Sequence, residues 1–194
     1  VKVREIRSIW VHSKVEFAVF LAALLATLVF GVQWGLAIGA TLGLAAYLWF
    51  SSVPRITRVG TVEDSDWAYR SIDRDEVEVD TMPVLVVRID RSLYFGNAAF
   101  CEDRILDFIS RHPEASCLVL DMRAVNTIDA SGVAMIERLL DNLDEKKLSV
   151  DFACAHKPVY EALQRNRVAR TRDFYTSVAD GVEECRNRLV CEGE

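Results

Sequence analysis

The sequence predicts an α/β domain, in which helices pack against a central β-sheet, preceded by an all-α transmembrane hairpin. Two patterns predict this fold class: residues 17–54 are mostly apolar without one charged residue, and after Pro83 short β-branched runs alternate with amphipathic stretches. Charge divides the chain in the same way. Residues 1–60 carry six basic and two acidic residues, a net of +4, so the remaining 17 basic and 27 acidic residues give −10.

The apolar run predicts a helical hairpin. As one helix its 38 residues would be about 57 Å long, nearly twice a hydrocarbon core of about 30 Å. A break at residues 31–35, which contain two glycines, Gln33 and Trp34, leaves two segments of about 17 residues. Lys14 and Arg55 flank the run, so the positive-inside rule puts both ends in the cytoplasm. The length and the second segment exclude a secretory signal; a buried helix pair of a soluble protein is the weaker alternative.

Glycine recurs at every fourth residue of the second segment, at Gly31, Gly35, Gly39 and Gly43. This spacing gives a helix face without side chains, and in lipid such a face allows another helix to approach closely. No ionisable residue lies inside the hairpin, so we expect a packing element and no transport substrate site in this chain.

Three domains follow from these patterns: the hairpin at 1–54, an acidic connector at 55–82 and the α/β domain at 83–194. The connector contains eight acidic residues between Glu63 and Asp80 and lacks sustained periodicity. A solvated linker is the interpretation that its composition favours.

The elements of the α/β domain are expected in alternation. Strands are predicted at 84–89, 93–95, 117–122 and 148–154. Helices are predicted from Asn97, with Cys101, Ile105, Phe108 and Ile109 as its buried stripe, from Ala130, near 158–165 and near 178–189.

The tetrad Asp129-Ala130-Ser131-Gly132 joins the third strand to its helix. Asp129 is a good N-cap residue whose carboxylate can accept from the amide of Ser131 or Gly132. The cap places the Ser131 hydroxyl in the first helical turn, where unpaired amides and the helix dipole favour a phosphate. Capping by Asp129 and close packing at Gly132 explain the same residues without any regulatory role.

This stretch resembles the signature loop of the STAS domain, which anti-sigma-factor antagonists share with SulP sulfate and anion permeases, the solute carrier family 26 of animals. In the antagonists the serine that matches Ser131 is phosphorylated. Residues 93–98, LYFGNA, resemble the permease STAS domains in particular, and 60–62 and 69–74 resemble the segment that joins permease helices to them, which favours an ordered path. The hairpin resembles the last two transmembrane helices of such a permease, whose anion site is built mainly by earlier helices.

Other chemistry is not indicated. The three histidines lack metal-ligand spacing, and no P-loop, GxGxxG, GxSxG or HExxH motif occurs, so we predict no enzyme, no cofactor and no metal. Asp121 and Asp129 could suggest a carboxylate pair but are interpreted as a strand-end residue and a cap. Arg123 is interpreted as the ion partner of Asp121 or as a solvated loop charge, and not as a catalytic cation. The five cysteines lack a CxxC pair and are interpreted as buried or free thiols, not as a disulfide framework or zinc site. The acidic C-terminal part argues against nucleic-acid binding.

The resemblance implies that the chain is the C-terminal part of a secondary active sulfate or anion transporter in a plasma or inner membrane. Its STAS domain would lie in the cytoplasm and serve assembly, trafficking or regulation. The expected partners are the remaining transmembrane helices, a second copy of the protein and a cytoplasmic protein. Two alternatives stay open, a membrane-tethered signalling switch controlled by phosphorylation of Ser131 and a module that senses nucleotide or lipid.

Overall fold

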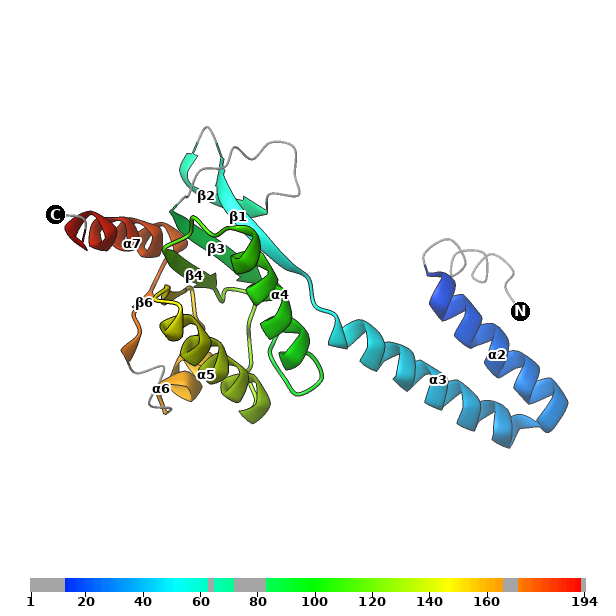
Figure 1. The fold of residues 1–194 in the computed structure, drawn as a ribbon. Helices are drawn as coiled ribbons and strands as arrows, with labels where there is room; N and C mark the ends of the chain where they lie inside the picture. Colours follow the sequence, from blue (N-terminus) through cyan, green and yellow to red (C-terminus); the bar gives the residue numbers. More distant parts are fainter. Residues whose placement is uncertain (1–12, 63–64, 72–82, 166–170, 193–194) are drawn as a thin grey trace. The chain divides into compact units, whose positions relative to one another are not determined.

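A computed structural model describes residues 13–62, 65–71, 83–165 and 171–192. The chain divides after Ser52 into two compact units, and each is described by itself. The described part of the first unit is a pair of adjacent helices, α2 (Lys14–Phe30) and α3 (Val32–Ser52) (Figure 1). By length and composition α3 can cross a membrane, and α2, with 17 residues, is slightly shorter.

The predicted break of the apolar run lies at Gly31. Its φ of 87° is a left-handed backbone conformation that glycine adopts without strain. The Gly31 amide donates to the Thr27 carbonyl, which ends α2, and α3 begins at the next residue. Ser13 caps the start of α2, because its hydroxyl accepts from the Glu16 amide at 3.2 Å.

The second unit contains a six-stranded sheet in the order β2-β1-β3-β4-β5-β6. Its strands are β1 (Ile56–Val62), β2 (Ser65–Ser71), β3 (Val84–Ile89), β4 (Cys117–Asp121), β5 (Ser149–Ala153) and β6 (Phe174–Tyr175). Strands β3 to β6 are parallel, and β1 is antiparallel to both of its neighbours. Among its described residues the unit also contains four α-helices: α4 (Ala98–Arg111), α5 (Ala130–Glu145), α6 (Lys157–Gln164) and α7 (Val178–Glu192).

Both faces of the sheet are buried, so its central strands have apolar residues at successive positions. In β4, Leu118 and Leu120 belong to the larger core, with α4, α5 and α6, whereas Cys117 and Val119 face the smaller core under α7. Figure 1 shows α4 and α5 in front of the sheet and α7 at a different face. The expected α/β fold class is confirmed.

The predicted helices and the strands at 84–89, 117–122 and 148–154 are present within a few residues of their expected ends. Two regions differ. The predicted strand at 93–95 is only an isolated bridge between Leu93 and Ile128. The predicted acidic connector supplies β1 and β2 to the sheet, where β1 pairs with β3 from Ile56 opposite Ile89 to Arg58 opposite Val87. Ile56 and Val59 are buried in the two cores, which explains why β1 packs in the sheet.

Candidate functional site

The loops that surround the predicted Ser131 site form a platform of two segments, residues 92–97 and 127–132. The Leu93 amide donates to the Thr127 carbonyl, and the Asp129 amide donates to the Leu93 carbonyl, each at 3.1 Å. The Thr127 amide donates to the Ser92 hydroxyl at 3.2 Å. These three bonds fix the loop before α4 against the loop before α5.

Asn97 stabilises the first segment from inside. Its side chain is 1% exposed; Oδ1 accepts from the Tyr94 amide at 3.0 Å, and Nδ2 donates to the Ser92 carbonyl at 2.9 Å. Both ends of a buried amide are therefore satisfied within five residues. The sequence predicted Asn97 as a helix start, and the structure adds that it shapes the loop and makes no side-chain cap bond.

Asp129 joins the two segments with one carboxylate. Oδ1 accepts from the Gly132 amide at 2.8 Å, which is the predicted N-cap bond of α5. Oδ2 accepts from the Phe95 amide at 3.0 Å. The second bond crosses to a segment 34 residues earlier in the chain, and no local pattern around Asp129 indicates it.

Gly132 is required by close packing of the same two segments. A Cβ at this position would lie 2.8 Å from Ile128 Cγ1, 2.9 Å from Leu93 Cβ and 3.1 Å from the Leu93 carbonyl oxygen. Because a backbone atom is among these neighbours, no rotation of a flexible side chain could make enough room. Gly132 therefore permits the approach of α5 to the first segment.

Ser131 lies exposed in the first turn of α5, a helix of 16 residues. Within the described part of the chain its hydroxyl has no hydrogen-bond partner, so it contributes little to the platform. Beside the platform Phe95 is 74% exposed although its amide is held by Asp129. Sequence reasoning did not single out Phe95, and its only signal was an aromatic residue before a Gly-Asn turn.

The four glycines of the hairpin do not share one environment. A Cβ on Gly35 would lie 1.8 Å from Thr27 Oγ1 and 2.8 Å from Thr27 Cα, and one on Gly39 would lie 3.0 Å from Ala23 Cβ. Gly35 and Gly39 thus face α2. Gly43 has open space, next to a cavity of about 380 Å³ lined by Glu16, Tyr47 and Phe50. Gly31 is the turn residue.

Two buried carboxylates are paired with arginines. Asp121, at the end of β4, is fully buried, and its Oδ2 lies 2.7 Å from Arg123 Nε, as expected from the sequence. Burial lowers the pKa of Arg123, but the hydrogen bond and charge of Asp121 outweigh this effect and raise it. Asp151 in β5 pairs with Arg188 of α7; burial raises the pKa of Asp151, and Arg188 opposes that rise.

One prediction about the cysteines is wrong. Cys117 in β4 and Cys185 in α7 form a disulfide that crosses the smaller core, with their Cα atoms 6.3 Å apart. The two residues are 68 positions apart and meet only because α7 packs on the sheet. Together with Asp151 they bring potential ligand atoms within 4.8 Å of one another. The sulfurs are bonded to each other and Asp151 is paired, so this group offers no open set of metal ligands.

A family model described as the STAS domain matches residues 76–181. Sulfate transporter 3.2 of Arabidopsis thaliana is 26% identical over 189 residues, and high affinity sulfate transporter 2 of Stylosanthes hamata is 25% identical over 186 residues. The matches cover 91% and 90% of this chain but only 29% and 28% of those transporters.

Among solved structures, the murine solute carrier 26 family member A9 anion transporter in its inward-facing state has a similar fold. The TM-score is 0.81 at 18% identity, over 93% of this chain and 30% of that one. The likeness in fold thus reaches beyond the α/β unit. The resemblance to SulP permeases that the sequence indicated is confirmed.

Proposed function

Because the chain belongs to the STAS domain family, we propose that it is the C-terminal part of a secondary active transporter for sulfate or a related anion. One observation carries this proposal: an uncharged apolar hairpin and a STAS domain follow each other in one chain, and sulfate transporters match it over about nine-tenths of its length. The chain spans about 29% of the length of those relatives, so transport itself would depend on segments outside it.

The hairpin would complete the membrane domain of that transporter. Its helices bear large exposed apolar side chains, among them Leu28, Val29, Leu36 and Trp49, which suit lipid or neighbouring helices and not water. From Phe17 to Pro54 the sequence offers no charged side chain to an anion. These features support a role in packing.

The STAS domain would lie in the cytoplasm and serve assembly, trafficking or regulation. The platform around Asp129 is the surface through which we propose that it acts, because two loops are fixed there and Phe95 is presented to solvent. A cytoplasmic protein and a second copy of the transporter are the proposed partners. Interfaces favour exposed aromatic anchors such as Phe95.

A second candidate function is a membrane-tethered switch in which Ser131 is phosphorylated. The exposed Ser131 hydroxyl at the start of α5 favours it, because a helix N-terminus stabilises negative charge. The Asp129 carboxylate already occupies that position, so repulsion between Asp129 and a phosphate would offset part of the stabilisation. We therefore favour the capping and packing role of these residues in a transporter.

The direct test is uptake of radiolabelled sulfate by cells that lack their own sulfate uptake and express the complete encoded protein containing this chain. We expect uptake above the vector control and competition by unlabelled sulfate or a related anion. A correctly inserted protein that moves neither sulfate nor bicarbonate nor a dicarboxylate would contradict the transporter proposal.

A further inference from the structure

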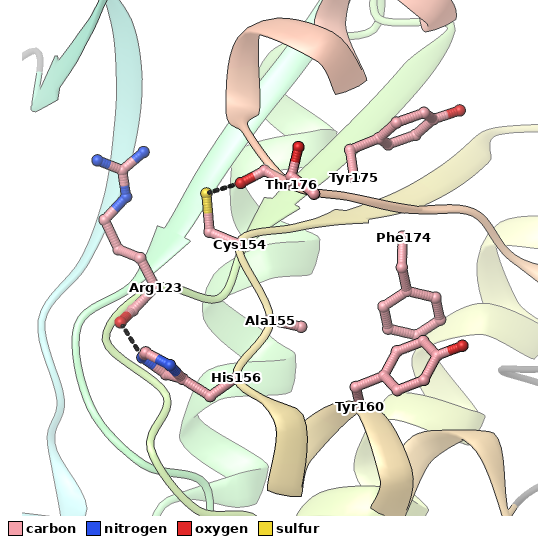
Figure 2. Close-up of a pocket in the computed structure, with 8 residues that line it drawn as sticks. All are labelled: Arg123, Cys154, Ala155, His156, Tyr160, Phe174, Tyr175 and Thr176. Carbon is pink, nitrogen blue, oxygen red and sulfur yellow. Dashed lines mark hydrogen bonds between the residues drawn. The ribbon is translucent and has the colours of Figure 1, made fainter.

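A cavity of about 570 Å³ opens at the carboxyl ends of three neighbouring parallel strands, on a part of the domain that the proposed function does not use (Figure 2). Arg123 follows β4, Cys154 follows β5 and Thr176 follows β6. Open α/β sheets bind small molecules at this edge, where the strands end and the loops diverge. The volume lies within the range of small-molecule sites.

Among the residues that the structure describes, Arg123 is the one arginine or lysine that lines the cavity, and no carboxylate of that part of the chain lines it. The buried carboxylate of Asp121 holds the guanidinium of Arg123 in position. Its Oδ1 accepts from Arg123 Nε at 2.9 Å and from the Arg123 backbone amide at 3.1 Å. Within the described residues no Nη nitrogen of Arg123 donates to a carboxylate. The Arg123 side chain is 44% exposed. The two Nη nitrogens of its guanidinium, called the Arg123 fork below, can therefore donate to an anion.

Neighbouring residues hold this arrangement in place. His156 Nε2 donates to the Arg123 carbonyl at 2.9 Å, which fixes the loop after β4 against the start of α6 (Figure 2). The Cys154 amide donates to the Tyr175 carbonyl at 2.9 Å, and its thiol donates to the Thr176 carbonyl at 3.5 Å. The cavity wall is therefore formed before any ligand binds.

Aromatic rings form the opposite wall. Phe174 and Tyr160 meet edge to face with their ring centroids 4.9 Å apart, and Phe174 stacks on the buried Phe152 at 4.8 Å. Figure 2 shows Phe174 and Tyr160 together on one side of Cys154 and Arg123 on the other. A flat ring packs well against such a pair, because offset and edge-to-face contacts are favourable.

From these contacts we infer that the cavity binds a small aromatic anion, with its ring against Phe174 and Tyr160 and its carboxylate, sulfonate or phosphate on the Arg123 fork. An anion without a ring would contact only Arg123, and an uncharged ring would contact only Phe174 and Tyr160. This cavity is a different site from the one that would bind the transported anion, because its lining residues belong to the STAS domain and not to the membrane helices.

Cys154 gives a reporter inside the cavity. Burial, followed by the charge of Asp121, raises the pKa of its thiol, and Arg123 opposes part of that rise. Alkylation is therefore slow, and a ligand can slow it further, so protection is compared with and without ligand in each variant separately. Cys191 is exposed and lies outside the cavity, which makes it an internal control in the same molecule. The full chain is reconstituted in nanodiscs, treated with N-ethylmaleimide at pH 8.5 and analysed by peptide mass spectrometry.

Phenyl phosphate is the probe, with inorganic phosphate and phenol as the separated halves. We expect phenyl phosphate to slow Cys154 alkylation saturably, by roughly tenfold at about ten times its Kd, without slowing Cys191. Neither half should do so at the same concentration. The proposal is overturned if phenyl phosphate gives no protection at about 10 mM, if either half protects equally, or if Cys191 is protected to the same extent.

Two variants locate the binding. Arg123→Lys retains a charge beside Asp121 but loses the fork, and Tyr160→Ala removes a partly exposed ring; each should weaken protection by roughly tenfold. Phe95→Ala removes an exposed ring outside the cavity and should leave protection unchanged. Circular dichroism checks that each variant is folded. Unchanged protection in folded Arg123→Lys and Tyr160→Ala would place the phenyl phosphate elsewhere and contradict the inference.

Discussion

Asp129 is the residue on which both loops of the platform depend, because one carboxylate accepts from the amides of Gly132 and Phe95. Its cap could be predicted from the sequence, since an aspartate stood directly before a helical pattern. The bond to Phe95 could not be predicted, because it joins residues 34 positions apart. The two hydrogen bonds of the buried Asn97 side chain could not be predicted from residue spacing either.

The first prediction compares Asp129→Ala with Ser131→Ala. Asp129→Ala should lower the free energy of unfolding by about 1–2 kcal/mol, because the cap and the bond to Phe95 are both lost, whereas Ser131→Ala should be nearly silent. At this chain length the loss corresponds to a fall in Tm of roughly 2–8 °C, measurable by circular dichroism. Asp129→Asn, which keeps an acceptor, is the control and should lie between the two.

Anion uptake by the same two variants tests whether Ser131 has a regulatory role. If Ser131 acts only in capping and packing, uptake in both variants should follow folded yield. Phosphate found on Ser131 in cells, together with altered uptake by Ser131→Ala at an unchanged protein level, would instead support the phosphorylation switch.

The second residue-scale prediction concerns Gly132. Gly132→Ala should destabilise the domain by about 1–3 kcal/mol, because the new methyl group meets Leu93 and Ile128 at less than 3.0 Å and the Leu93 backbone must shift. Thermal unfolding measures the loss, with Ser131→Ala as the neighbouring control. A Gly132→Ala variant as stable as the parent would show that the two segments pack less closely than described.

At the scale of elements, α4, α5 and the central strands could be predicted because their period is local and their apolar positions are many. Strands β1 and β2 were not, since their region is rich in acidic residues and their order depends on pairing across the sheet. The two-residue β6 is too short to show a period. The disulfide between Cys117 and Cys185 depends on the packing of α7 on the sheet, which no spacing of cysteines indicates.

The glycines of α3 provide an element-scale prediction with a built-in control. Gly35→Ala should separate α2 from α3 and reduce folded yield, because its Cβ would overlap Thr27 and lie 2.8 Å from a backbone atom. Gly39→Ala should have a small effect, since Ala23 Cβ at 3.0 Å needs only a slight shift, and Gly43→Ala should have none. Fluorescence-detected size-exclusion chromatography of detergent extracts measures the yield. An equal loss of folded yield in Gly35→Ala and Gly43→Ala would contradict this, because it would mean that the glycine face of α3 packs against a helix other than α2.

At the scale of the whole molecule, the net charge of +4 over residues 1–60 and −10 over the remainder separates two environments. The basic residues flank an apolar hairpin, and the acidic part folds into a domain with its own two cores. This organisation could be predicted from composition alone. The fold of the domain then required its strand and helix patterns, and membership of the STAS family came from the match over residues 76–181.

The central claim is that the hairpin crosses the membrane twice and leaves the STAS domain in the cytoplasm. Labelling of intact cells with a membrane-impermeant maleimide tests it in the complete protein. Gln33→Cys, at the turn, should react from outside, whereas the native exposed Cys191 should react only after the membrane is permeabilised. Reaction of Cys191 in intact cells, with Gln33→Cys protected until permeabilisation, would contradict the account.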